Sequence, residues 1–143
     1  MSRRLRGTRR ATLPQLSTTL GRKMMQPDKK NPYVAEIYRE ITHVRPHEED
    51  DWDWMSHGMS LLKRGKLGRA EKKFKELLVA QPEHHDGYEG LALTYQKMNM
   101  KDRAFYFMEE ALKRARGFLQ DGSLDPEVIE EMEEELRQIR GMG

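Results

Sequence analysis

The chain contains no cysteine. This absence excludes a disulfide framework, a thiolate metal site and a cysteine nucleophile. Long apolar runs are also missing, since no stretch approaches the roughly 20 residues that a membrane-spanning helix requires. The basic start of the chain is not followed by an apolar stretch of the length found in secretory signals. Together these absences predict a small, soluble cytoplasmic protein without a membrane span.

Apolar residues are few as well. Of the 143 residues, 36% are hydrophobic and 35% are charged, which is too polar for a large two-layer core. Two Trp, five Tyr and four Phe nevertheless need a buried environment, so wholesale disorder is not expected. The length predicts one small domain, and the composition favours a binding role over an enzymatic one.

Acidic residues are nearly absent from the first 30 positions, which hold nine Lys or Arg and one acid and carry a net charge of +8. The remaining residues sum to −6, so the basic character belongs to an N-terminal arm, residues 1–30. The arm has no aromatic residue, and we expect it to be mobile when alone. Its basic residues before position 24 are Arg3, Arg4, Arg6, Arg9, Arg10, Arg22 and Lys23.

We expect the basic arm to bind an acidic or phosphate-bearing surface. One alternative is nucleic-acid binding through the same residues, which would depend steeply on salt. Another is targeting, because an Arg-rich, Ser/Thr-rich and acid-poor start resembles an organellar transit segment.

A helix followed by an acidic linker is predicted for residues 31–50. Asn31 can cap the helix, and Pro32 can occupy its first position. The helix should end before Pro46, because a residue that precedes proline avoids the helical region. Its apolar face would comprise Val34, Ile37, Tyr38 and Ile41.

The stretch 51–118 repeats itself with a period of 34 residues. At that shift Trp54 aligns with Tyr88, Gly58 with Ala92, Ala70 with Ala104, and Phe74 with Met108. Large side chains meet large ones and small meet small, so each period should be a pair of antiparallel helices in close contact at the small residues. A turn at Gly65 separates the first pair, and Asn99 lies at the same place one period later.

The first repeat contains Trp54-x2-His57-Gly58-x2-Leu61, followed by Ala70-x3-Phe74, Leu77 and Pro82. The second contains Tyr88-x2-Leu91-Ala92-x2-Tyr95, followed by Ala104-x3-Met108 and Ala111. Each of the two resembles a tetratricopeptide repeat. His57 stands where the family usually has Leu. Arg116 stands where its closing Pro would be, which suggests that the last helix runs on through Phe118 and Leu119. The resemblance implies an all-α fold, a short α-solenoid of two hairpins, and a family whose partners are diverse.

By the same resemblance, the first helix of each pair should line an inner groove. The residues that would face it are Trp52, Met55, Met59 and Leu62 in the first repeat and Glu89, Leu93 and Gln96 in the second. The groove should be apolar and methionine-rich at one end and polar at the other, and methionine suits adaptable recognition of an apolar or amphipathic segment. A structural alternative stays open, in which the helix near 34–41 folds back over this methionine stripe.

A last helix is predicted for residues 126–140. Asp125 suits its N-cap, Pro126 its first position and Gly141 its end. The apolar stripe of this helix comprises Val128, Ile129, Met132, Leu136 and Ile139. We interpret it as a terminal cap with one face on the last repeat and one in water. The alternative is an amphipathic helix offered to a partner.

No catalytic or metal-binding constellation emerges from the sequence. The histidines at positions 43, 47, 57, 84 and 85 form no helical metal motif. Adjacent helical residues point about 100° apart, so His84 and His85 should not face one ion, and we interpret the histidines as surface residues. The basic run 63–75 is interpreted as a solvated helix face. We therefore predict no catalytic residue, no cofactor and no metal.

Five segments follow from these observations: the arm 1–30, a helix with an acidic linker 31–50, repeat one 51–84, repeat two 85–120 and a capping helix 121–143. The predicted function is non-catalytic protein binding, as an adaptor or as a structural or assembly subunit of a larger complex. The partner would be one or more proteins, with nucleic acid and self-association as further options.

Overall fold

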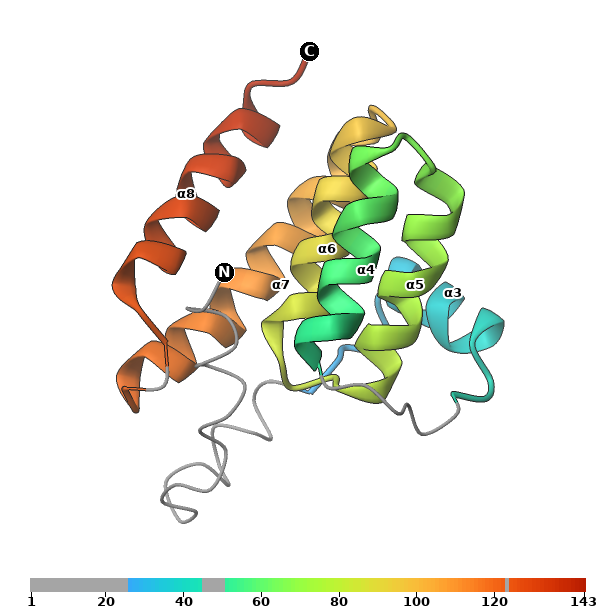
Figure 1. Cartoon of the computed structure of the whole chain (residues 1–143), viewed down its shortest axis with the longest axis horizontal. Coiled ribbons are helices and arrows are strands. Elements are labelled where there is room, and N and C mark those ends of the chain that lie inside the picture. The colour runs from blue at the N-terminus through green and yellow to red at the C-terminus, as the bar shows by residue number, and fades with distance from the viewer. Residues whose placement is uncertain (1–25, 45–50, 123) are drawn as a thin grey trace.

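The computed structural model describes residues 26–44, 51–122 and 124–143 (Figure 1). For residues 51–53 it describes the backbone only. These residues form helices and no strand, which confirms the predicted all-α class. The helices are α3 (Pro32–Glu40), α4 (Asp51–Lys63), α5 (Leu67–Ala80), α6 (His85–Lys97), α7 (Lys101–Gln120) and α8 (Pro126–Arg140). The acidic linker and most of the basic arm lie outside the described residues.

Helix α3 begins as the sequence predicts. The side chain of Asn31 accepts hydrogen bonds from the backbone N–H groups of Tyr33 and Val34, and Pro32 occupies the first turn. Helix α8 also begins with a proline. Asp125 occupies its N-cap position, but its side chain makes no capping hydrogen bond.

The two hairpins, α4–α5 and α6–α7, are joined internally by the same turn. Gly65 and Asn99, 34 residues apart, both adopt the left-handed conformation, with φ of 78° and 65°. The hydrogen bonds also correspond: Lys66 N–H to Leu61 C=O and Gly65 N–H to Leu62 C=O in the first turn, Met100 N–H to Tyr95 C=O and Asn99 N–H to Gln96 C=O in the second. Each turn is a Schellman motif that satisfies the last carbonyls of its helix. The sequence period therefore corresponds to a repeated backbone unit.

Phe74 of α5 packs between two glycines on different helices. A methyl group at Gly58 of α4 would lie 2.5 Å from the Phe74 ring, and one at Gly90 of α6 would lie 2.2 Å from it. The ring itself is fully buried. The close approach at Gly58 is as predicted, whereas the sequence comparison did not single out Gly90. This ring therefore joins the first hairpin to the first helix of the second.

A buried arginine forms a hydrogen bond with the loop between the hairpins, residues 81–84. The side chain of Arg114 in α7 is fully buried. It donates hydrogen bonds of 3.0 Å to the Pro82 carbonyl, the Tyr88 hydroxyl and the Glu110 carboxylate, and its guanidinium lies 3.8 Å from the centre of the Tyr88 ring. A guanidinium with this many partners is compensated for its loss of water. Nothing in the repeat pattern had indicated this residue.

Helices α3 and α8 lie on opposite sides of the two hairpins (Figure 1). Helix α3 is held by α5 and α7: Lys75 donates to Glu40 at 2.6 Å, Arg103 donates to Glu36 at 2.9 Å, and the rings of Tyr33 and Tyr106 meet edge to face. These contacts place α3 beside the second helices of the hairpins, and not over the methionine stripe of α4.

Helix α8 packs on α7, which runs through Phe118 and Leu119 as predicted. Val128, Met132 and Ile139 on its apolar stripe are fully buried. The burial agrees with a cap on the second hairpin, and not with a helix whose apolar face is left for a partner.

Gly90→Ala should destabilise the protein by about 1–3 kcal/mol, because the added methyl group overlaps the Phe74 ring, which the neighbouring helices hold in place. The matched control is Gly68→Ala in α5, where an added Cβ would have no described atom within 4 Å apart from its chain neighbours and the nearby backbone of its own helix. This change should stabilise by a few tenths to about 1 kcal/mol, since alanine favours the helix. Urea midpoints of the two variants measure the difference, and equal shifts would contradict the packing described.

Candidate functional site

The residues predicted to line a groove fall into three groups. Met55 and Leu62 belong to the core, with 2% and 4% of their surfaces exposed. Met59, Leu93 and Gln96 are half-buried, while Glu89 is fully buried. The side chain of Trp52 and the basic residues from Arg3 to Lys23 lie outside the described part of the structure.

Met59 and Leu93 occupy equivalent places in the two hairpins, 34 residues apart. Both pack against the core from the first helix of their hairpin and keep part of their surface exposed. Helices α4 and α6 are in contact. Among the side chains that the structure describes, the apolar part of the predicted groove is therefore reduced to these two, with Gln96 one turn beyond Leu93.

The basic run on the first hairpin is mostly exposed, although Lys73 is half-buried and Lys75 is buried. Lys63, Arg64, Lys66, Arg69 and Lys72 are exposed, as the interpretation of a solvated face predicts. Lys75 is instead buried between two acids, at 2.6 Å from Glu40 and 3.1 Å from Glu71. Its ammonium group therefore serves the packing of α3 on α5.

Two adjacent histidines at the start of α6 are buried, which corrects the expectation that they are surface residues. His84 is 8% exposed and His85 is 0% exposed. His84 is the N-cap of α6, with an extended backbone, and its Nδ1 accepts a hydrogen bond from the backbone N–H of Asp86. The argument from helical spacing fails because His84 precedes the helix. The two imidazoles consequently stack, with centroids 4.6 Å apart and planes at 22°.

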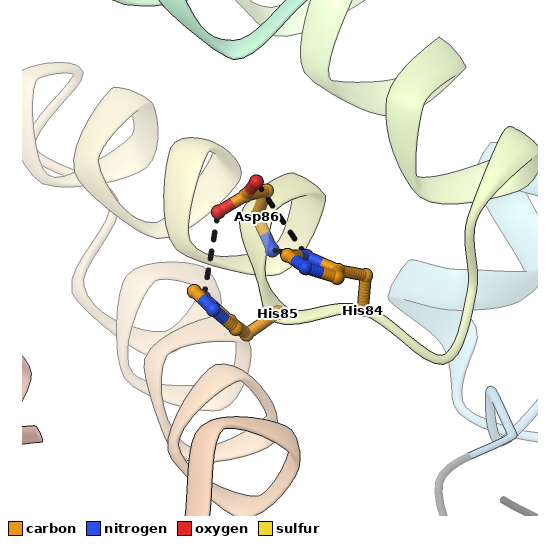
Figure 2. Close-up of side chains that lie close together, drawn as sticks. All are labelled: His84, His85 and Asp86. Atoms are coloured by element: carbon orange, nitrogen blue, oxygen red, sulfur yellow. Dashed lines mark hydrogen bonds and ion pairs between the residues drawn. The ribbon is translucent and has the colours of Figure 1, made fainter. Parts of the chain in front are cut away.

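Carboxylates complete this cluster. Figure 2 shows the Asp86 carboxylate facing both rings, with one oxygen 3.5 Å from His84 Nδ1 and the other 3.5 Å from His85 Nδ1. Glu89, one turn further along α6, has an oxygen 3.8 Å from the same nitrogen of His85. Asp86 and Glu89 are essentially unexposed, and both have further partners. Phe118 of α7 covers the imidazoles, with its ring centre 5.0 Å from that of His84.

Burial controls the charge state of His85. Loss of water lowers the pKa of this imidazole below its usual value of 6.5, an effect that the neighbouring His84 strengthens and that the Asp86 and Glu89 carboxylates oppose. His85 is therefore neutral at pH 7. Neither of its ring nitrogens has a hydrogen-bond partner among the described residues, and an unsatisfied buried polar group costs about 1–3 kcal/mol.

The cluster brings together ligand types that suit a metal ion. His84, His85 and Asp86 each offer one ligand atom, and these atoms lie within 4.8 Å of one another. Imidazole and carboxylate groups bind divalent transition metals. Sequence reasoning missed the cluster, although one signal was present: acids at positions 86 and 89 stand where the first repeat has Trp52 and Met55.

Comparisons with family models, with curated proteins and with solved structures found no match for this chain. In the described ranges, no helix is both long enough and apolar enough to cross a membrane.

His85 should make the metal-free protein sensitive to mild acid. The unfolded chain binds a proton at His85 near pH 6.5, whereas the folded chain, with its lowered pKa, resists protonation. The unfolded state therefore binds more protons as the pH falls below about 6.5, and stability is lost in that direction. His85→Phe, which keeps an aromatic ring beside His84 and Phe118, should flatten the profile.

Urea midpoints measured from about pH 7.5 to about pH 5 provide the test. Asp86, Glu89 and His84 also face this ring, so the quantity of interest is the difference between the wild-type and variant profiles. Parallel profiles would show that His85 does not contribute.

Proposed function

We propose that this chain is a non-catalytic protein-binding module of the tetratricopeptide kind, acting as an adaptor or as a structural or assembly subunit of a larger complex. Two hairpins that repeat the same turn and the same period support the proposal. Stacked helical hairpins present the first helix of each unit on a common face, and such proteins use that face for binding. Helix α8 would cap the array by covering the face of α7 on which a further hairpin would otherwise pack.

The observation that carries the proposal is the pair Met59 and Leu93. These side chains are apolar, only partly buried, and located at equivalent positions on α4 and α6. A single half-exposed apolar residue on a surface is ordinary, but two at the same repeat position on contacting helices offer a partner two apolar contacts. Methionine adapts its shape to different ligands.

The partner segment should be apolar or amphipathic. Gln96 lies one turn from Leu93 on α6 and offers amide hydrogen bonds beside the apolar pair. An amphipathic helix or an extended peptide with one apolar edge would use both features. The basic arm, with its charge of +8, would add a second contact on an acidic or phosphate-bearing surface of the same partner or complex.

Replacing both apolar residues tests the face directly. In Met59→Glu/Leu93→Glu, partner binding should be lost while most of the helical content remains, because neither side chain is fully buried. The chain is used as bait in quantitative affinity purification, and each protein recovered with the wild type is purified and titrated against wild type and variant.

The control is Met100→Glu, which adds a carboxylate at an apolar side chain that is 38% exposed, on the turn between α6 and α7. A partner that binds this control with wild-type affinity and fails to bind the double variant supports the proposal. Equal affinities for all three proteins would overturn it. A chain lacking residues 1–25 separates the contribution of the arm, which should fall as salt is raised.

A further inference from the structure

The cluster at the start of α6 holds a buried imidazole, that of His85. His85 is 0% exposed, and both its Nδ1 and Nε2 lack a hydrogen-bond partner among the residues that the structure describes. Buried polar groups in folded proteins are nearly always paired with protein, water or an ion. The position of His85 therefore calls for a ligand, and the neighbouring groups indicate what kind.

The distances in the cluster approach those of a tetrahedral metal site. Ligand atoms about 2.0–2.1 Å from a zinc ion lie about 3.3–3.4 Å from one another at the corners of a tetrahedron. The Asp86 carboxylate oxygens lie 3.5 Å from His84 Nδ1 and 3.5 Å from His85 Nδ1, and a Glu89 oxygen lies 3.8 Å from His85 Nδ1. The two Asp86 distances end on different oxygens. The carboxylate must therefore turn until one oxygen faces both imidazoles, and the side chains must move inward, before the ligand atoms reach tetrahedral spacing.

We propose that His84, His85 and Asp86 bind one divalent transition-metal ion of the Zn²⁺ class, with Glu89 as the fourth ligand. This inference goes beyond the protein-binding role and does not depend on it. Two imidazoles with two carboxylates match the preferences of Zn²⁺ and Co²⁺. Ca²⁺ and Mg²⁺ prefer oxygen ligands alone.

The charges favour a cation of this kind. Asp86 and Glu89 are essentially unexposed, and a divalent ion bound between them would compensate two ionised carboxylates in a site that water barely reaches. The N-terminus of α6 opposes a cation, because the helix dipole is positive there. The effect of that dipole is smaller than that of two carboxylates in direct contact with the ion.

Binding requires a specific rearrangement. The imidazole planes lie at 22° to each other, so the nitrogen lone pairs of the two stacked rings lie in nearly parallel planes, and one ring must rotate before both can point to the same ion. His84 Nδ1 also accepts the capping hydrogen bond from the Asp86 backbone at 3.2 Å. If that nitrogen becomes the ligand, the metal replaces the capping proton donor.

The test uses the full chain without a histidine tag. CoCl₂ is titrated while visible absorption is recorded, since four-coordinate Co²⁺ absorbs more strongly than hydrated Co²⁺, and ZnCl₂ is titrated by calorimetry. We expect saturable binding of one ion per chain, and a thermal midpoint that rises with Zn²⁺ and returns when a chelator is added.

Two variants preserve the fold in different ways. His84→Asn retains a good N-cap but supplies a poor metal ligand, and His85→Phe retains an aromatic ring beneath Phe118. Each should weaken Co²⁺ binding roughly tenfold or more. The matched control, His57→Gln on the exposed face of α4, should bind as the wild type does.

Loss of binding in both variants, with circular dichroism spectra and melting curves that show a folded protein, supports the site. Non-saturable binding to the wild type would overturn the proposal. So would affinities that are the same in the wild type and in the two cluster variants, because the ion would then be held elsewhere.

Discussion

The packing of the Phe74 ring between Gly58 and Gly90 is the contact on which the arrangement of the helices depends. The ring fits between α4 and α6 only because neither glycine carries a side chain there. Close-packed interiors have no spare volume, so the positions of α4, α5 and α6 are set together. Helix α6 in turn packs on α7, and α7 carries α8.

The two hairpins share the same turn between their helices. Gly65 pays no steric penalty for a positive φ, and asparagine tolerates the same conformation better than most residues. Corresponding hydrogen bonds at the two turns then end α4 and α6 in the same way. Met59 and Leu93 precede these turns by the same number of residues. The repeated turn is therefore the reason that the two partly exposed side chains occupy equivalent positions in their hairpins.

Polar groups inside the fold occupy two contrasting environments. The Arg114 guanidinium has hydrogen-bond partners on three residues and a stacked aromatic ring, which makes it a structural group. His85 has neighbouring acids, but its ring nitrogens lack a hydrogen-bond partner in the described part of the chain. This contrast between the two buried groups is the basis of the metal site that we propose.

Local chemistry and periodicity were enough to predict the helices, the 34-residue repeat and the two turns, because these depend on residues near one another in sequence. The extension of the last repeat helix follows for the same reason, and the close contact at Gly58 follows from side-chain size. Tertiary packing decided the rest. It buried Met55, which a single-helix pattern could not distinguish from a surface residue. It also brought Phe118 over His84 and His85, and Arg114 against Tyr88. The sequence separations of these contacts follow no regular period, because contacts between helices depend on the position of each helix in space.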